Sequence, residues 1–183
     1  MSAPVPRVVV DAGVAAVKRQ LRITGADDDA LLGELVRSAL AIGEAFVGAA
    51  LIARAHEDVV AVTGAWTPLA AEPVGAITGV TALPTDAAPF VLPVASYAVD
   101  IDPAGRGWVR VAVGAGATRV AVAYRAGMAA GWDALPPAIA QGAAALAAHL
   151  FEDRAARNLP PASVAALWRP WRRMRLGCER RRA

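Results

Sequence analysis

The sequence predicts an α+β fold: a mainly helical core of about four helices, with a small antiparallel β module inserted into it. Two observations support this prediction. Apolar residues recur at three- and four-residue steps before residue 57 and again after residue 126, as they do along one face of an α-helix. Between these parts, short β-type runs are separated by Gly and Pro, a pattern typical of strands and turns.

Two helices are expected in the N-terminal part. Residues 1–10 should form an extended arm, and Asp11 is placed to cap a short helix over 12–21. The aspartates at 27–29 suit the start of a second helix, over 28–50, because carboxylates complement the free N–H groups there. We prefer this interpretation to a metal site, since three adjacent acids at a helix start do not converge on one ion. The expected apolar stripe of this helix is Leu31, Leu32, Leu35, Ala39, Ile42 and Phe46.

The middle of the chain has the composition of a β module. Its last two apolar runs alternate well, and PTDAAP (84–89) and DPAGRG (102–107) contain residues that favour turns. The expected strands are 58–63, 74–83, 96–101, 107–113 and 118–125.

Helical periodicity returns in the C-terminal part. Pro136 or Pro137 fits the first position of a third helix, which Asn158 and the following prolines should end. Ser163 is placed to cap a last helix, and Pro170 should kink or restart it because proline lacks a backbone N–H. The expected stripe of the third helix is Ile139, Ala143, Leu146 and Leu150.

Four parts therefore follow one another along the chain. An N-terminal arm and helical pair (1–56) precede the β module (57–126), and C-terminal helices (127–168) complete the helical core. A basic tail (169–183) carries seven Arg and one Glu, about +6, whereas residues 1–168 carry 12 basic and 15 acidic side chains, about −3. A protein that coats nucleic acid should present a positive face on its body, so this charge distribution argues against that class.

The residue types that catalysis and metal binding require are scarce. His56 and His149 have no partner at metal-ligand spacing, and no serine stands in a nucleophile-elbow context. Cys178 is the only cysteine, so it forms neither an intrachain disulfide nor a zinc site. We expect no enzyme, no cofactor and no metal site, and a soluble intracellular protein without a secretory or membrane-spanning segment.

Two groups of motifs occur in a characteristic order. The first is a K-x-x-L-R-I segment from Lys18 to Ile23, an acidic turn at 27–29, and a long helix with Phe46 near its Ala-Leu-Ile end at 50–52. The second is SYAVD (96–100), VAVAYRAGM (120–128), LPPAIAQGAAALAAHLFEDR (135–154) and VAALWRPWRRMRLG (164–177). This series covers nearly the whole chain and resembles the head–tail connector (adaptor) proteins of long-tailed phages. A related variant occurs in gene transfer agents, which are phage-like particles encoded by bacteria.

The resemblance implies a structural protein without catalysis or cofactor. Connectors of this kind form a ring, usually of twelve subunits, beneath the capsid portal, where they extend the DNA channel and support the next tail component, the stopper. The implied partners are other copies of the chain, the portal protein, the next neck or tail component, and DNA that passes without specific binding; no membrane is implied. The implied location is the particle neck, with the bacterial cytoplasm before assembly.

The C-terminal segment is the predicted partner-binding site. An apolar stripe containing two tryptophans lies beside an arginine face, and Trp and Arg are enriched at the anchor points of protein interfaces. Two alternatives remain open: the tryptophans pack on the subunit's own helices, or the Arg-rich tail makes this a nucleic-acid-binding protein. The predicted portal- or partner-binding residues are Trp168, Arg169, Trp171, Arg172, Arg173, Arg175, Arg180, Arg181 and Arg182.

Overall fold

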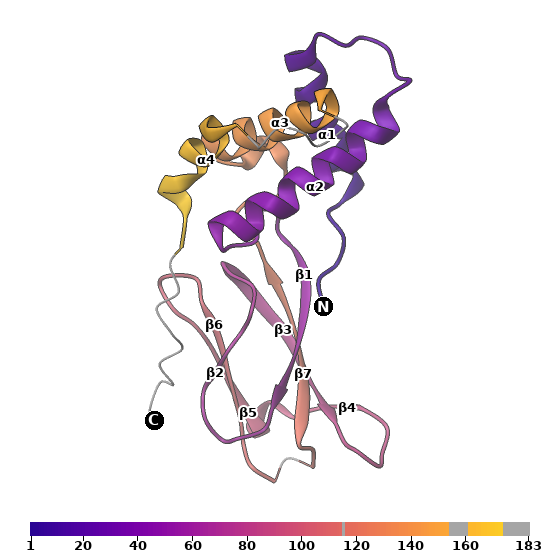
Figure 1. Cartoon of the computed structure of the whole chain (residues 1–183). Coiled ribbons are helices and arrows are strands. Elements are labelled where there is room, and N and C mark those ends of the chain that lie inside the picture. Colours follow the sequence, from indigo (N-terminus) through magenta and orange to yellow (C-terminus); the bar gives the residue numbers. More distant parts are fainter. Residues whose placement is uncertain (115, 154–160, 174–183) are drawn as a thin grey trace. The chain divides into compact units, whose positions relative to one another are not determined.

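The computed structural model describes residues 1–114, 116–153 and 161–173, which divide into two compact units (Figure 1). The helical unit comprises residues 4–52 and 128–173 of this part, and the β unit comprises residues 1–3 and 53–127. Helices and antiparallel sheets together give the α+β fold that the sequence predicts.

The helical unit is built on three helices that pack on one another, with a fourth that packs mainly on the third. Within the described residues, none of the helices is both long and apolar enough to cross a membrane. The elements are α1 (Arg7–Leu21), α2 (Asp29–Val47), α3 (Pro137–Glu152) and α4 (Ala162–Trp168), with 3-10 turns η2 (Trp132–Ala134) and η3 (Arg169–Trp171).

Helix α1 begins at Arg7, five residues earlier than predicted, so only residues 1–6 form the extended arm. The run of three valines at 8–10 suggested extended backbone, because β-branched residues have lower helix propensity. Packing outweighs that preference, since Val9, Val10, Val14 and Val17 lie at helical spacing and are all buried. Asp11 therefore lies inside the helix, 3.8 Å from the Arg7 guanidinium one turn away, and does not cap it.

Helix α2 begins and ends close to the predicted residues, but it buries a different face. Asp28 occupies the N-cap position, Asp29 pairs with Lys18 (Oδ1 to Nζ, 2.6 Å), and Gly48 ends the helix in the left-handed conformation. The predicted stripe was partly wrong, because Leu31 and Ile42 are exposed. The helix packs through its glycine-containing side, where close approach of backbones is possible, so the buried residues are Leu32, Gly33, Val36, Ala39, Leu40, Gly43 and Val47.

The C-terminal helices follow the predicted pattern with shifted ends. Pro137 is the first residue of α3, and Ile139, Ala143 and Leu146 are buried as predicted. The helix ends at Glu152, before the predicted stop at Asn158. Pro161, not Ser163, stands at the N-cap position of α4, so the predicted serine cap is wrong.

The β unit is a pair of antiparallel sheets with a shared core. One has the strand order β1-β7-β3-β4 and the other β2-β6-β5 (Figure 1). Side chains from both sheets form one apolar cluster, which includes Val80, Val109, Val111, Val120 and Val122. The sheets therefore pack face to face, as in a β-sandwich. The strands are β1 (Arg54–Ala61), β2 (Thr67–Pro68), β3 (Val74–Leu83), β4 (Phe90–Val91), β5 (Tyr97–Ile101), β6 (Gly107–Val111) and β7 (Arg119–Ala126).

The five predicted strands correspond to β1, β3, β5, β6 and β7, whereas the two-residue strands β2 and β4 are too short to leave a periodic signal. The first residues of the chain add to the edge of the first sheet. Ala3 N–H donates to the Ala55 carbonyl at 2.9 Å, and Glu57 N–H donates to the Met1 carbonyl at 2.7 Å.

The turn between β5 and β6 is organised by one carboxylate. Asp102 accepts hydrogen bonds from the backbone N–H groups of Ala104 and Arg106, both at 2.9 Å, and from Trp108 Nε1 at 3.5 Å. Gly105 occupies the left-handed region with φ of 78°. The hydrogen bond from Arg106 N–H, with smaller contributions from Trp108 and Ala104, holds the pKa of the Asp102 carboxyl below its usual value despite some desolvation.

We expect Asp102→Asn to destabilise the β unit at pH 7 and to have little effect at low pH. A carboxyl whose folded pKa is depressed contributes stability above its unfolded pKa of about 3.9, and that contribution is lost as the pH falls through the folded pKa. Urea unfolding of both proteins at pH 7 and at a series of values below 4 measures the difference. An equal difference in unfolding free energy at every pH contradicts this assignment.

Candidate partner-binding surface

Trp168, the last residue of α4, lies in the core of the helical unit and is 2% exposed. Its indole N–H donates a hydrogen bond to the Ile139 carbonyl of α3 at 3.3 Å (Nε1 to O). The Phe46 ring of α2 lies beside it, with 6.0 Å between ring centroids and 51° between ring planes. A buried indole needs an acceptor for its N–H, and α3 supplies one here.

Two glycines form the slot that holds this indole. A Cβ atom at Gly142 of α3 would overlap the indole nitrogen and lie 2.8 Å from Trp168 Cε2. A Cβ atom at Gly43 of α2 would lie 3.3 Å from Trp168 Cη2. The absence of side chains at these two positions therefore gives the tryptophan its place between the helices.

The residues after Trp168 turn across the end of α2. The 3-10 turn η3 contains Pro170 and replaces the α-helix there, which confirms the predicted kink or restart. Arg173 N–H donates to the carbonyl of Val47, the last residue of α2, at 2.7 Å. This bond satisfies one of the carbonyl groups that the end of a helix leaves without an intrahelical partner. The Arg172 guanidinium lies 5.8 Å from the centroid of the Phe46 ring.

Three exposed side chains share this turn, and we call them the Trp171 surface: Arg169, Trp171 and Arg172. The Trp171 side chain is 39% exposed, which is unusual for so large an apolar residue. Within the described part of the chain, neither Arg169 nor Arg172 forms an ion pair with a carboxylate. The surface thus combines an exposed indole with two guanidinium groups whose planar forks match carboxylates.

The structure brings together five of the predicted site residues and separates their roles. Trp168 packs on the subunit's own helices, which is the alternative that the sequence left open for it, so it supports the surface without being part of it. Arg173 is half-buried and holds the turn to α2 through its backbone. The sequence did not connect Gly43 or Gly142 with the tryptophan, although both fall among the small residues of predicted helices. Arg175, Arg180, Arg181 and Arg182 lie outside the described residues.

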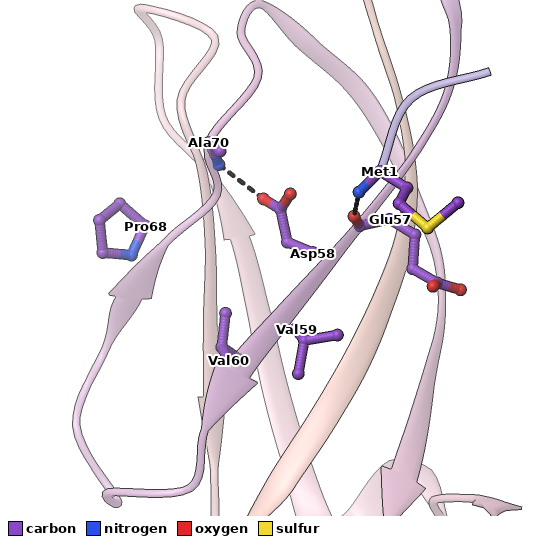
Figure 2. A pocket seen from close by; sticks show the side chains of 7 residues that line it. All are labelled: Met1, Glu57, Asp58, Val59, Val60, Pro68 and Ala70. Carbon is purple, nitrogen blue, oxygen red and sulfur yellow. Dashed lines mark hydrogen bonds between the residues drawn. The ribbon is translucent and has the colours of Figure 1, made fainter.

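The β unit contains a separate hollow beside the strand β1, with a volume of about 430 Å³ (Figure 2). It is lined by Met1, Glu57, Asp58, Val59, Val60, Pro68 and Ala70. Figure 2 shows the Asp58 carboxylate directed toward Ala70, whose N–H it accepts at 2.7 Å. The same oxygen accepts the Tyr124 hydroxyl proton at 2.8 Å, and the Tyr124 oxygen in turn accepts Ala71 N–H at 3.0 Å.

These bonds give Asp58 a structural role at the wall of the hollow. Its carboxylate joins β1 to the loop after β2, and Tyr124 carries the connection into the core of the sandwich. The tyrosine ring also stacks on His56, with 5.5 Å between centroids and 23° between planes. The Asp58 carboxylate and the Tyr124 hydroxyl are both engaged in bonds that hold the fold together.

Comparison with solved structures gives matches over nearly the whole chain. A chain in the neck of an empty gene transfer agent particle is 29% identical, with a TM-score of 0.75 over 98% of this chain and 99% of that one. This chain is similar to a neck protein of gene transfer agents. A chain of the native gene transfer agent virion matches at 28% identity and a TM-score of 0.75, covering 96% of this chain and 97% of that one.

A third neck chain, from a native gene transfer agent particle, matches at 27% identity and a TM-score of 0.70 over 98% of this chain and 99% of that one. The empty and native necks were computed with sixfold and twelvefold symmetry, respectively. The matches confirm the resemblance that the motif order predicted. No protein-family model matches the chain, and no curated protein is significantly similar to it.

Proposed function

We propose that this chain is a structural adaptor subunit in the neck of a phage-like particle. In this proposal it forms a ring beneath the capsid portal, extends the DNA channel and joins the head to the tail. One observation carries the proposal: the chain matches gene transfer agent neck chains over 98% of its length, with a TM-score of 0.75 for the empty particle. A match across both units, rather than over one common module, supports an equivalent role for the whole chain.

The proposed partners follow from a position in the neck. Copies of the chain contact each other around the ring, and the symmetry of the similar necks supports six or twelve positions. The portal protein lies on one side of the ring and the next neck or tail component on the other. DNA passes through the channel without specific binding, in keeping with a body whose net charge is about −3.

The Trp171 surface is the proposed contact with the portal. An exposed tryptophan that enters an apolar pocket, with arginines that reach carboxylates around it, matches the anchors that dominate binding energy at protein interfaces. The backbone bond from Arg173 to Val47 fixes this turn on the helical unit before the partner arrives. A preformed turn loses less conformational entropy on binding than a flexible one.

We expect the purified chain to form an annular oligomer when it is mixed with the portal protein of the same particle. Twelve copies of the 18.8 kDa chain have a mass of about 226 kDa, and six have about 113 kDa. Mass photometry of the chain alone and with the portal measures this, and electron microscopy of the same sample shows whether the oligomer is a ring. Detection of monomer alone under both conditions overturns the proposal.

A further inference from the structure

The outer face of the sheet β1-β7-β3-β4 is largely apolar, and within the described residues the valines at its two edges are exposed. Paired residues cross this face in a row, Val59–Ala121–Thr81–Val91, and the two valines at its ends are 54% and 76% exposed. A sheet face that meets water normally carries polar side chains in these alternating positions. We call this surface the Val59 face. Its other residues are Glu57, Ala61, Gly79, Leu83, Arg119, Ala123 and Arg125.

The sheet β2-β6-β5 presents a face of different character on the opposite side of the sandwich. Its Val109 and Val111 point into the shared core, so the exposed Arg110 and its partner Ala98 lie on the other side of the sheet. Trp108 also alternates to that side but is only 9% exposed. The Arg110 guanidinium lies 5.1 Å from the centroid of the Trp66 ring. We call this surface the Trp66 face: Trp66, Ala98, Asp100, Asp102 and Arg110.

The two faces differ in the size of their side chains and in their charge. The Val59 face has short side chains at its centre and carries Arg119 and Arg125 against one acid, Glu57. The Trp66 face carries the large, half-buried ring of Trp66, with Asp100 and Asp102 against one cation, Arg110. The excess charge is therefore positive on the first face and negative on the second, which favours contact between unlike faces over contact between like ones.

We propose that the Val59 face of one copy of this chain packs against the Trp66 face of a second copy. Opposite faces of one sandwich used in this way form a head-to-tail interface, which generates a ring when the rotation between neighbouring subunits closes. The inference rests on the proposed function and specifies which surfaces join neighbouring subunits. The sixfold and twelvefold symmetry of the similar necks supports a second copy as the occupant of this face.

The Val59 face is smaller than the surface that a stable protein dimer buries. Four strands about 4.8 Å apart and four paired rows give roughly 400 Å². A standard protein interface buries about 800 Å² on each partner. The face alone is too small for a stable dimer, so the contact forms together with other contacts when the ring closes.

Cross-linking with single thiols tests this arrangement. In a Cys178→Ser background, Val59→Cys and Ala98→Cys place one thiol on each face, and a bismaleimide of about 10 Å reach spans the spacing of packed sheets. Rings are formed with the portal protein and checked by mass photometry before the reagent is added. We expect the double variant to give a ladder of covalent oligomers, and an equal mixture of the two single variants to give only mixed dimers.

Three outcomes separate this inference from the proposed function. Rings that form but give no ladder overturn the inference and leave the adaptor role standing. Efficient cross-linking of the Val59→Cys chain to itself also overturns it, because that result means two like faces meet. Absence of rings from the unmodified chain overturns the proposed function, and the inference falls with it.

A charge substitution provides a second readout. Val59→Glu places an anion on the face that meets the acidic Trp66 face, so we expect at least a tenfold lower yield of rings with unchanged circular dichroism. Val113→Glu is the matched control, because this valine is 76% exposed and lies beyond the end of β6, outside the paired rows of the Val59 face. Equal ring yields from the two variants overturn the inference.

Discussion

Trp168→Ala is expected to lower the free energy of unfolding of the helical unit by about 3–5 kcal/mol. The indole is 2% exposed and fills a slot between α2 and α3, so its removal leaves a cavity and deprives the Ile139 carbonyl of a donor. Urea unfolding followed by circular dichroism at 222 nm, where helices dominate the signal, measures the change. The loss is a large share of the stability of a domain of this size.

Trp171→Ala is the matched control for this prediction. It removes the same side chain three residues later, from a position that is 39% exposed, and we expect it to cost about 1 kcal/mol or less. Equal losses for the two variants contradict the buried position of Trp168.

A substitution at Gly142, which lines the slot, tests the position of Trp168 independently. Alanine normally stabilises a helix interior by about 1 kcal/mol relative to glycine. Gly142→Ala should instead destabilise the unit, because the new methyl group overlaps the Trp168 indole. Gly33→Ala is the control, since its Cβ would lie 3.6 Å from the nearest side-chain atom, Val10 Cγ1. A stabilising Gly142→Ala substitution means that the indole does not occupy this slot.

Local signals in the sequence were sufficient for most of the architecture. Prolines, glycines and the change from helical to alternating periodicity placed α2, α3 and the five longer strands, because these signals act within a few residues of each element. The start of α1 was misplaced because the propensity of consecutive valines points to extended backbone. Burial of Val9 and Val10 decides that conformation, and burial depends on residues far along the chain.

The face that α2 buries illustrates a second limit. Leu31, Leu35 and Ile42 form one apolar stripe of this helix, and Leu32, Val36 and Leu40 form another. Apolarity alone does not choose between them. The choice follows from Gly43, which admits Trp168 from a helix more than 100 residues later. Which face of α2 is buried can therefore be decided only when the helix that packs on it is known.

The partner-binding site remains a prediction from the sequence, and only the structure separates the roles of its residues. Trp and Arg content identified the segment, and Pro170 correctly indicated that the helix changes there. The two tryptophans are equivalent in composition, and only the packing shows that Trp168 faces inward while Trp171 faces solvent. Truncation before Trp168 therefore removes a core residue along with the proposed binding segment. Tests of binding should use substitutions after it.

Trp171→Ala is expected to weaken binding of the portal protein by at least thirtyfold while leaving the fold intact. Loss of a tryptophan anchor costs about 2 kcal/mol or more at an interface, and each 1.4 kcal/mol is a factor of ten in affinity. Biolayer interferometry with immobilised portal protein measures the change. Ile42→Ala is the control. Ile42 is an apolar residue of the same unit with a similar exposure, 44%, but it lies on α2 and is not part of the Trp171 surface. Similar losses from both variants mean that Trp171 is not an anchor.

The arginines of the Trp171 surface distinguish a protein partner from DNA. Lysine keeps the charge of arginine but lacks the planar fork that binds a carboxylate through two hydrogen bonds. If the partner is the portal, Arg169→Lys with Arg172→Lys should weaken binding about tenfold, with a modest dependence on salt. If these residues instead contact DNA phosphates, lysine should largely substitute for arginine, and affinity for DNA should fall steeply with salt concentration. Retention of portal binding by the double lysine variant, together with salt-sensitive DNA binding, would favour the nucleic-acid alternative.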